Sequence, residues 1–151
     1  MYDQILLPTD GSEGMADVID HAVGLARSHD ATLHALHVLD TATMSRMPME
    51  ASWETITGML REEGERALED VRQAAEEVPV EGEITEGSPS REIVDYTGSN
   101  DVDLIVMGTH GRGGIDRLLL GSVAERVIRT ASVPVMTIRV GDAPEVEELD
   151  G

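Results

Sequence analysis

The chain has 151 residues, of which 40% are hydrophobic, so its length suits one globular domain. It contains no cysteine and no apolar run of about eighteen residues, which excludes disulfides, thiolate metal sites and a membrane-spanning helix. Thirty acidic residues stand against 11 basic ones, and the net charge of -19 disfavours a duplex-DNA partner, because no basic stripe is available to neutralise phosphates.

Such a charge makes a compact chain repel itself, and concentrated salt screens that repulsion. We therefore expect a protein of a salt-rich cytoplasm, as in a halophile, with an acidic mesophilic protein as the alternative. The chain runs from Met1 directly into an apolar segment without the charged and apolar regions of a secretory signal, so a cytoplasmic location is expected.

Apolar runs and helical periodicity alternate along the sequence. Residues 12–28 and 53–78 place apolar side chains at steps of three and four, as in amphipathic helices. Ser88 followed by Pro89 is typical of a helix start. In chain order, the pattern predicts strands at 4–8, 32–39, 80–86, 104–107 and 135–140, and helices at 12–28, 53–78, 89–96 and 122–131.

Strands and helices that alternate in this way form βαβ units, which build a parallel sheet with helices on both faces. The fold class is therefore α/β. In open sheets of this class, ligands bind beyond the carboxyl ends of the strands, where the strand order reverses.

A glycine-rich segment lies between the strand at 104–107 and the last helix. Its spacing is Gly108, two residues, Gly111, nine residues, Gly121 and then Ser122. Glycines let several backbone amides face one concavity, and a helix amino terminus adds positive charge, so the segment is suited to bind phosphate. Arg112 could pair with a terminal phosphate, or lie on the surface. The alternative for the segment is a glycine-rich turn without a ligand.

Two polar residues extend this hypothesis. Asp10, after the first strand, could accept hydrogen bonds from ribose hydroxyls or hold water around a metal ion, or merely form an Asx turn. Ser122 could donate to a phosphate, or merely cap the last helix. His34 and His37 lie three apart on a strand and so point to opposite faces, which disfavours a shared zinc site. No catalytic residue is assigned.

At these residues the chain resembles the universal stress protein family of the nucleotide-binding type, whose phosphate-binding pattern is Gly-x2-Gly-x9-Gly-Ser/Thr. Residues 5–12 (ILLPTDGS) and 132–135 (SVPV) are similar to the family's first strand and its approach to the last strand. The resemblance covers 1–140, which we take as a single domain, and leaves 141–151 as an acidic tail expected to be disordered.

The resemblance implies a three-layer α/β/α fold of the adenine nucleotide alpha hydrolase-like, Rossmann-like kind, with five parallel strands in the order 3-2-1-4-5. It implies ATP with Mg²⁺ or Mn²⁺ as ligand, adenine near Pro8, Thr9 and the backbone of Val38, and the sugar near Met107. It also implies a homodimer through the last strand, Val135–Val140. The expected nucleotide-binding residues are Pro8, Thr9, Asp10, Val38, Met107, Gly108, His110, Gly111, Arg112, Gly113, Gly121, Ser122 and Val123.

The expected role is an ATP-dependent stress-response switch that acts on an unknown protein partner, without nucleic acid or membrane. Neither a general base nor a lysine that could reach the phosphates is visible, which favours a switch over a fast enzyme. Slow ATP hydrolysis or self-phosphorylation stays open. The other alternative is a protein-interaction module of the same fold with an empty cleft.

Overall fold

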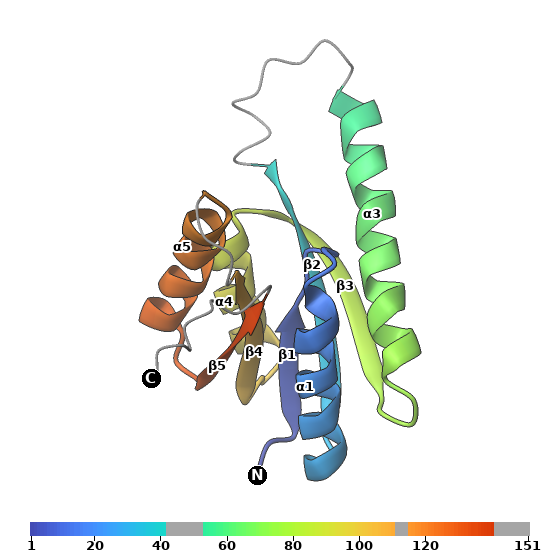
Figure 1. Ribbon diagram of the computed structural model, residues 1–151, viewed down its shortest axis with the longest axis vertical. Coiled ribbons are helices and arrows are strands. Elements are labelled where there is room, and N and C mark those ends of the chain that lie inside the picture. Colours follow the sequence, from blue (N-terminus) through green and yellow to red (C-terminus); the bar gives the residue numbers. More distant parts are fainter. Residues whose placement is uncertain (42–52, 111–114, 141–151) are drawn as a thin grey trace, which may run out of the picture.

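The computed structural model describes residues 1–41, 53–110 and 115–140, and Figure 1 shows the arrangement of their helices and strands. In chain order these elements are β1 (Gln4–Pro8), α1 (Met15–His29), β2 (Thr32–Asp40), α3 (Trp53–Ala74), β3 (Val80–Gly87), α4 (Pro89–Ser99), β4 (Leu104–His110), α5 (Ile115–Thr130) and β5 (Val135–Val140).

The five strands form one sheet in the order β3-β2-β1-β4-β5, and all four neighbouring pairs are parallel. This confirms the expected fold class and strand order. Crossovers run from β1 outward to β2 and β3, and then return to the other side of β1 for β4 and β5. The order therefore reverses between β1 and β4, which makes the carboxyl edge of this strand pair the expected ligand position.

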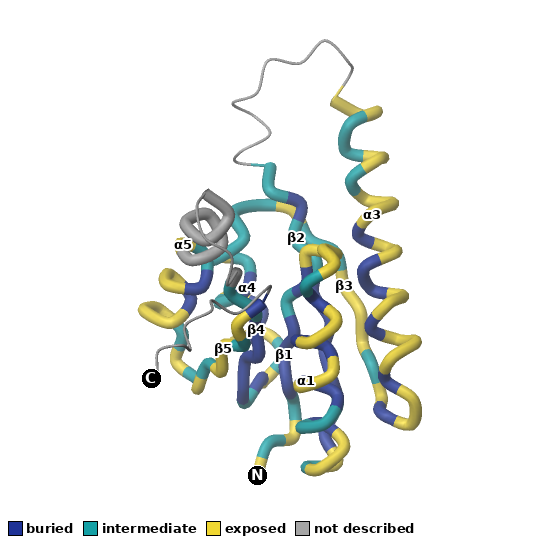
Figure 2. Tube along the Cα trace, viewed as in Figure 1, coloured by how far each residue is buried: buried dark blue, intermediate teal, exposed yellow. Residues whose placement is uncertain are grey.

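Helices cover both faces of the sheet. One apolar cluster packs α1 and α3 on one face, and a second packs α4 and α5 on the other. The central strands are buried on both sides, and β1 contributes Ile5, Leu6 and Leu7, each fully buried. Figure 2 shows the resulting dark core between exposed outer helix faces. None of the helices in the described ranges is long and apolar enough to cross a membrane.

The start of the last helix was predicted wrongly. We expected it at Ser122, whereas α5 begins at Ile115. The residues in between include Asp, Arg and three leucines, which tolerate or favour helix, and a single Gly121 costs only about 1 kcal/mol within one. Other ends moved by a few residues: α1 begins at Met15, α3 ends at Ala74 and β4 continues to His110.

Candidate functional site

The turn after β1 is held by its own side chains. Thr9 is buried, and its Oγ1 accepts a hydrogen bond from the Gly11 amide at 3.1 Å. Asp10 accepts from the Ser12 amide through Oδ1 at 2.9 Å, which is the Asx turn considered from the sequence. Gly11 has φ +77°, a conformation that suits glycine, and Ala67 of α3 lies against it. The turn therefore has one fixed shape at the strand's carboxyl end.

The hydrogen-bond ladder between β1 and β2 ends at this turn. The amide of Thr9 donates to the carbonyl of Leu36 at 2.9 Å, so even-numbered residues of β2 direct their backbone groups toward β1. Continuing that pattern, the Val38 amide would donate to the Thr9 carbonyl, and the Val38 carbonyl would accept from the Gly11 amide.

Neither of these two ladder bonds forms. The Thr9 carbonyl accepts instead from Nδ1 of His37 at 2.9 Å, and the Gly11 amide donates instead to Thr9 Oγ1. Within the described residues, the amide and the carbonyl of Val38 are thus left without partners on their β1 side. They form an open donor–acceptor pair at the carboxyl edge of the sheet.

His37 reaches the turn from the face of the sheet that α3 covers. Its ring packs against Gly64, where a Cβ would lie only 2.7 Å from His37 Cδ2. Gly64 is buried in α3, so this helix glycine provides room for the ring. Sequence reasoning assigned His37 no role at the site. The sequence signal that could have indicated it is a histidine near the end of the apolar segment 32–39, together with a glycine inside the following helix.

Apolar side chains stand beside the open pair on the opposite face of the sheet. Met107 belongs to the buried cluster under α4 and α5, and the partly buried Val38 and Val123 pack against it. Pro8 ends β1, the neighbour of β4. The structure thus brings Val38, Met107 and Val123 together, and Pro8 leads from β1 directly into the turn at Thr9 and Asp10.

The glycine-rich segment is described in part. Gly108 lies within β4, and a Cβ there would stand 2.9 Å from side-chain atoms of both Val18 and Val140. Its lack of a side chain therefore has a packing cause. His110 is the last residue of β4, and the expected contributions of Gly111, Arg112 and Gly113 lie outside the described residues.

The expectation that Gly121, Ser122 and Val123 open a helix is corrected by the start of α5. These residues lie about two turns inside the helix, where backbone amides bond to carbonyls four residues earlier. Their amides are therefore not the free donors of a helix amino terminus. Ser122 itself is exposed.

The described residues contain no group of three metal-ligating side chains placed to hold an ion. Asp10 can still serve a cation carried by nucleotide phosphates, because Mg²⁺ commonly takes one or two protein carboxylates and completes its shell with phosphate and water. Oδ1 of Asp10 is engaged by Ser12, and its other oxygen has no protein partner in the described part. A single exposed carboxylate is suited to contact a cation that the phosphates already hold, and it cannot form a metal site by itself.

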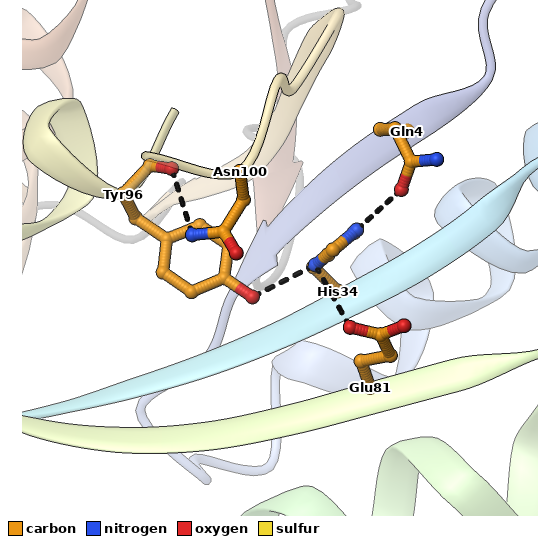
Figure 3. A network of polar contacts seen from close by, with 5 residues as sticks. All are labelled: Gln4, His34, Glu81, Tyr96 and Asn100. Atoms are coloured by element: carbon orange, nitrogen blue, oxygen red, sulfur yellow. Dashed lines mark hydrogen bonds and ion pairs between the residues drawn. The ribbon is translucent and has the colours of Figure 1, made fainter. Parts of the chain in front are cut away.

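A second polar network lies away from this edge, near the start of β1 (Figure 3). The Tyr96 hydroxyl donates to Nδ1 of buried His34 at 2.7 Å, so Nε2 donates to Oε1 of Gln4 at 2.6 Å. Burial lowers the pKa of His34, against the raising effect of Glu81 and Glu83. His34 faces α4 and His37 faces α3, which confirms that the two histidines point to opposite sides of β2.

The family model of the universal stress protein family matches residues 1–139, and the chain belongs to this family. It is 44% identical over 141 residues to the universal stress protein MJ0531 of Methanocaldococcus jannaschii, covering 92% of this chain and 83% of that protein. The structure of MJ0577, from the same organism, superposes with a TM-score of 0.80 at 30% identity, covering 95% of this chain and 99% of that one.

Two further structures of the family contain adenine nucleotides. A universal stress protein in complex with cAMP has a TM-score of 0.73 at 20% identity, covering 93% of this chain and 99% of its own. A universal stress protein from Archaeoglobus fulgidus in complex with dAMP has a TM-score of 0.64 at 23% identity, covering 93% and 98%. At these identities the likeness concerns the fold.

Proposed function

We propose that this universal stress protein binds an adenine nucleotide at the carboxyl edge between β1 and β4. The observation that carries the proposal is the open amide and carbonyl of Val38. Adenine presents a ring nitrogen acceptor beside its 6-amino donor, which complements such a pair. Met107 and Val123 supply apolar surface for the flat base and sugar. The cAMP and dAMP complexes of family members support the same ligand class.

ATP with Mg²⁺ or Mn²⁺ is the form we propose, on the resemblance of the glycine pattern and the position of Asp10. The role is a nucleotide-dependent switch in a stress response, acting in the cytoplasm, with 1–140 as its domain. A multiple-turnover ATPase rate near the roughly 1 per second at the low end of typical enzymes would contradict the switch.

Base selectivity tests the Val38 pair directly. Purine riboside 5′-triphosphate lacks the 6-amino group and therefore cannot donate to the Val38 carbonyl. We expect it to bind about tenfold more weakly than ATP, the size of one net hydrogen bond at the upper end of its range. Equal affinities would mean that the Val38 carbonyl does not contact the base.

A homodimer through β5 is also proposed. The two sheet edges differ, because β3 exposes Glu81, Glu83 and Glu86, whose charges oppose strand pairing. β5 exposes Met136 and Thr137, with Ile128 of α5 nearby in sequence and 54% exposed. Pairing of β5 with its copy about a two-fold axis would cover that open edge. Sedimentation of the protein at several concentrations tests it, and a monomer throughout would contradict it.

One observation favours a second function, contact with a protein partner. The amino-terminal half of α3 extends beyond the carboxyl edge of the sheet (Figure 1), and its buried residues begin only at Gly64. Trp53 is 42% exposed and Met59 57% exposed on this half. We take these exposed apolar side chains on a projecting helix segment as the candidate contacts for such a partner. A partner there could respond to nucleotide bound at the neighbouring turn.

A further inference from the structure

His37 has a position that the nucleotide proposal alone does not explain. Its Nδ1 donates a hydrogen bond to the Thr9 carbonyl at 2.9 Å, although the Val38 amide would be that carbonyl's regular donor in the ladder. In the same turn, Thr9 Oγ1 accepts a hydrogen bond from the Gly11 amide at 3.1 Å. The side chains of His37 and Thr9 thus replace the amide and the carbonyl of Val38 as hydrogen-bond partners of the turn.

We propose that His37 is a positioning residue that keeps the β1–β2 ladder open at Val38. By donating to the Thr9 carbonyl, the imidazole takes the place of the Val38 amide at the end of the ladder, and that amide stays available to a ligand acceptor. Thr9 does the same for the Val38 carbonyl, because its Oγ1 accepts the hydrogen bond of the Gly11 amide that would otherwise go to that carbonyl. The proposal rests on the proposed adenine site and deepens it, because it names the residues that create the base-reading groups.

The packing of α3 supports this role. The His37 ring is fixed against Gly64, and the turn that it holds is fixed at Gly11 by contact with Ala67, one turn further along α3. The α3 helix therefore lies against His37 and against Gly11 in the turn that follows Thr9. Because that helix is on the face opposite Met107 and Val123, it can hold the ladder open without occupying the space for the base.

The first test needs no ligand. Amide hydrogen exchange is measured by NMR for Val38 and Leu36 in the wild type, His37→Leu and His37→Asn. In the wild type the Val38 amide should exchange much faster than that of Leu36. Leucine cannot donate to Thr9, so the ladder should close and slow Val38 exchange about tenfold or more in His37→Leu. Asparagine can place an amide donor near the position of Nδ1, so His37→Asn should keep the wild-type pattern.

The second test uses MgATP as the probe and two helix variants that form a matched pair. Gly64→Ala pushes against the His37 ring, whereas a Cβ at Gly58 of the same helix meets nothing within 4 Å. MgATP affinity should fall about tenfold in Gly64→Ala and His37→Leu, and should stay at the wild-type value in Gly58→Ala. His37→Asn should restore most of the affinity.

The outcomes separate the two proposals. A wild type that binds no MgATP, with Val38 exchange as described above, would overturn the nucleotide site while leaving the open ladder in place. A wild type that binds MgATP, with exchange and affinity unchanged in both His37→Leu and Gly64→Ala, would overturn the role of His37 alone. If His37→Leu fails to fold, Gly64→Ala and His37→Asn still decide the question.

Discussion

Val140, the last residue of β5, fills the space in front of Gly108 in β4: a Cβ on Gly108 would lie 2.9 Å from Val140 Cγ2. Val18 of α1 closes the same space from the other side, also at 2.9 Å. Gly108, the first glycine of the Gly-x2-Gly-x9-Gly pattern, therefore lets β4 pack closely against both β5 and α1.

Replacing this glycine should destabilise the protein without any nucleotide present. Gly108→Ala forces a methyl group between two buried valines, and overpacking of this kind costs about 1–3 kcal/mol. Urea unfolding in molar salt measures it. Gly24→Ala is the control, because a Cβ there meets nothing within 4 Å in α1. A Gly108→Ala protein as stable as the wild type would contradict the packing account.

The two glycines of α3 should respond in opposite directions. Gly58→Ala adds a methyl group in open space and should raise the free energy of unfolding by about 0.5–1 kcal/mol, through helix propensity alone. Gly64→Ala meets the His37 ring at 2.7 Å and should lower it instead. Thermal and urea unfolding of both variants check this. If both substitutions raise the free energy of unfolding, the His37 ring moves aside without cost.

Stability should rise with salt. At a net charge of -19, repulsion acts across the whole surface, and the Debye length shrinks to about 3 Å at 1 M salt. The unfolding midpoint should increase steadily from low to molar KCl. Sucrose at equal osmolality separates exclusion effects from charge screening. A midpoint that stays level in KCl would remove the argument for a salt-rich cytoplasm.

Stability should fall on mild acidification because of His34. Burial holds the pKa of this imidazole below its ordinary value of 6.5, so the unfolded chain binds the proton more readily. The contribution of His34 is complete above pH 6.5 and is lost as the pH falls from there through the lower, folded-state pKa. Glu81, with Oε1 4.0 Å from Nδ1, and Glu83 oppose the shift but do not reverse it.

The His34→Gln variant isolates this effect from the many carboxylates. Unfolding free energies of the two proteins are compared from pH 7.5 downward, and their difference should change only below pH 6.5. A difference that is constant with pH would mean that the pKa of His34 is the same in the folded and the unfolded chain. Burial also raises the pKa of its partner Tyr96 to about 12, so that hydroxyl stays a donor throughout.

The regular part of the fold could be predicted from the sequence because its signals are local. Apolar strands such as 135–140 and the Ser88–Pro89 start of α4 depend on neighbouring residues only. The start of α5 could not, because Gly121 looks like a boundary in sequence and is tolerated inside the helix. Helix ends are decided by competition between capping and packing, and none of the strongest cap residues, Ser, Thr, Asp or Asn, directly precedes Ile115.

The parts of the candidate site that lie along one segment could be placed from the sequence, and the contacts that join distant segments could not. Asp10 and Thr9 were expected after β1 and lie there. The role of His37 depends on a ladder bond that does not form, and on Gly64 about thirty residues away in the sequence. Neither leaves a pattern in a single sequence. The Val38 backbone entered only through the resemblance, and in the described part of the structure its amide and carbonyl lack ladder partners on the β1 side.

Calorimetric titration with MgATP in molar KCl tests the central claim most directly, using protein that has been unfolded and refolded to remove carried-over ligand. We predict one site with a dissociation constant on the order of micromolar. Absence of binding at millimolar MgATP would contradict the nucleotide site and leave the partner surface on α3 as the function to pursue.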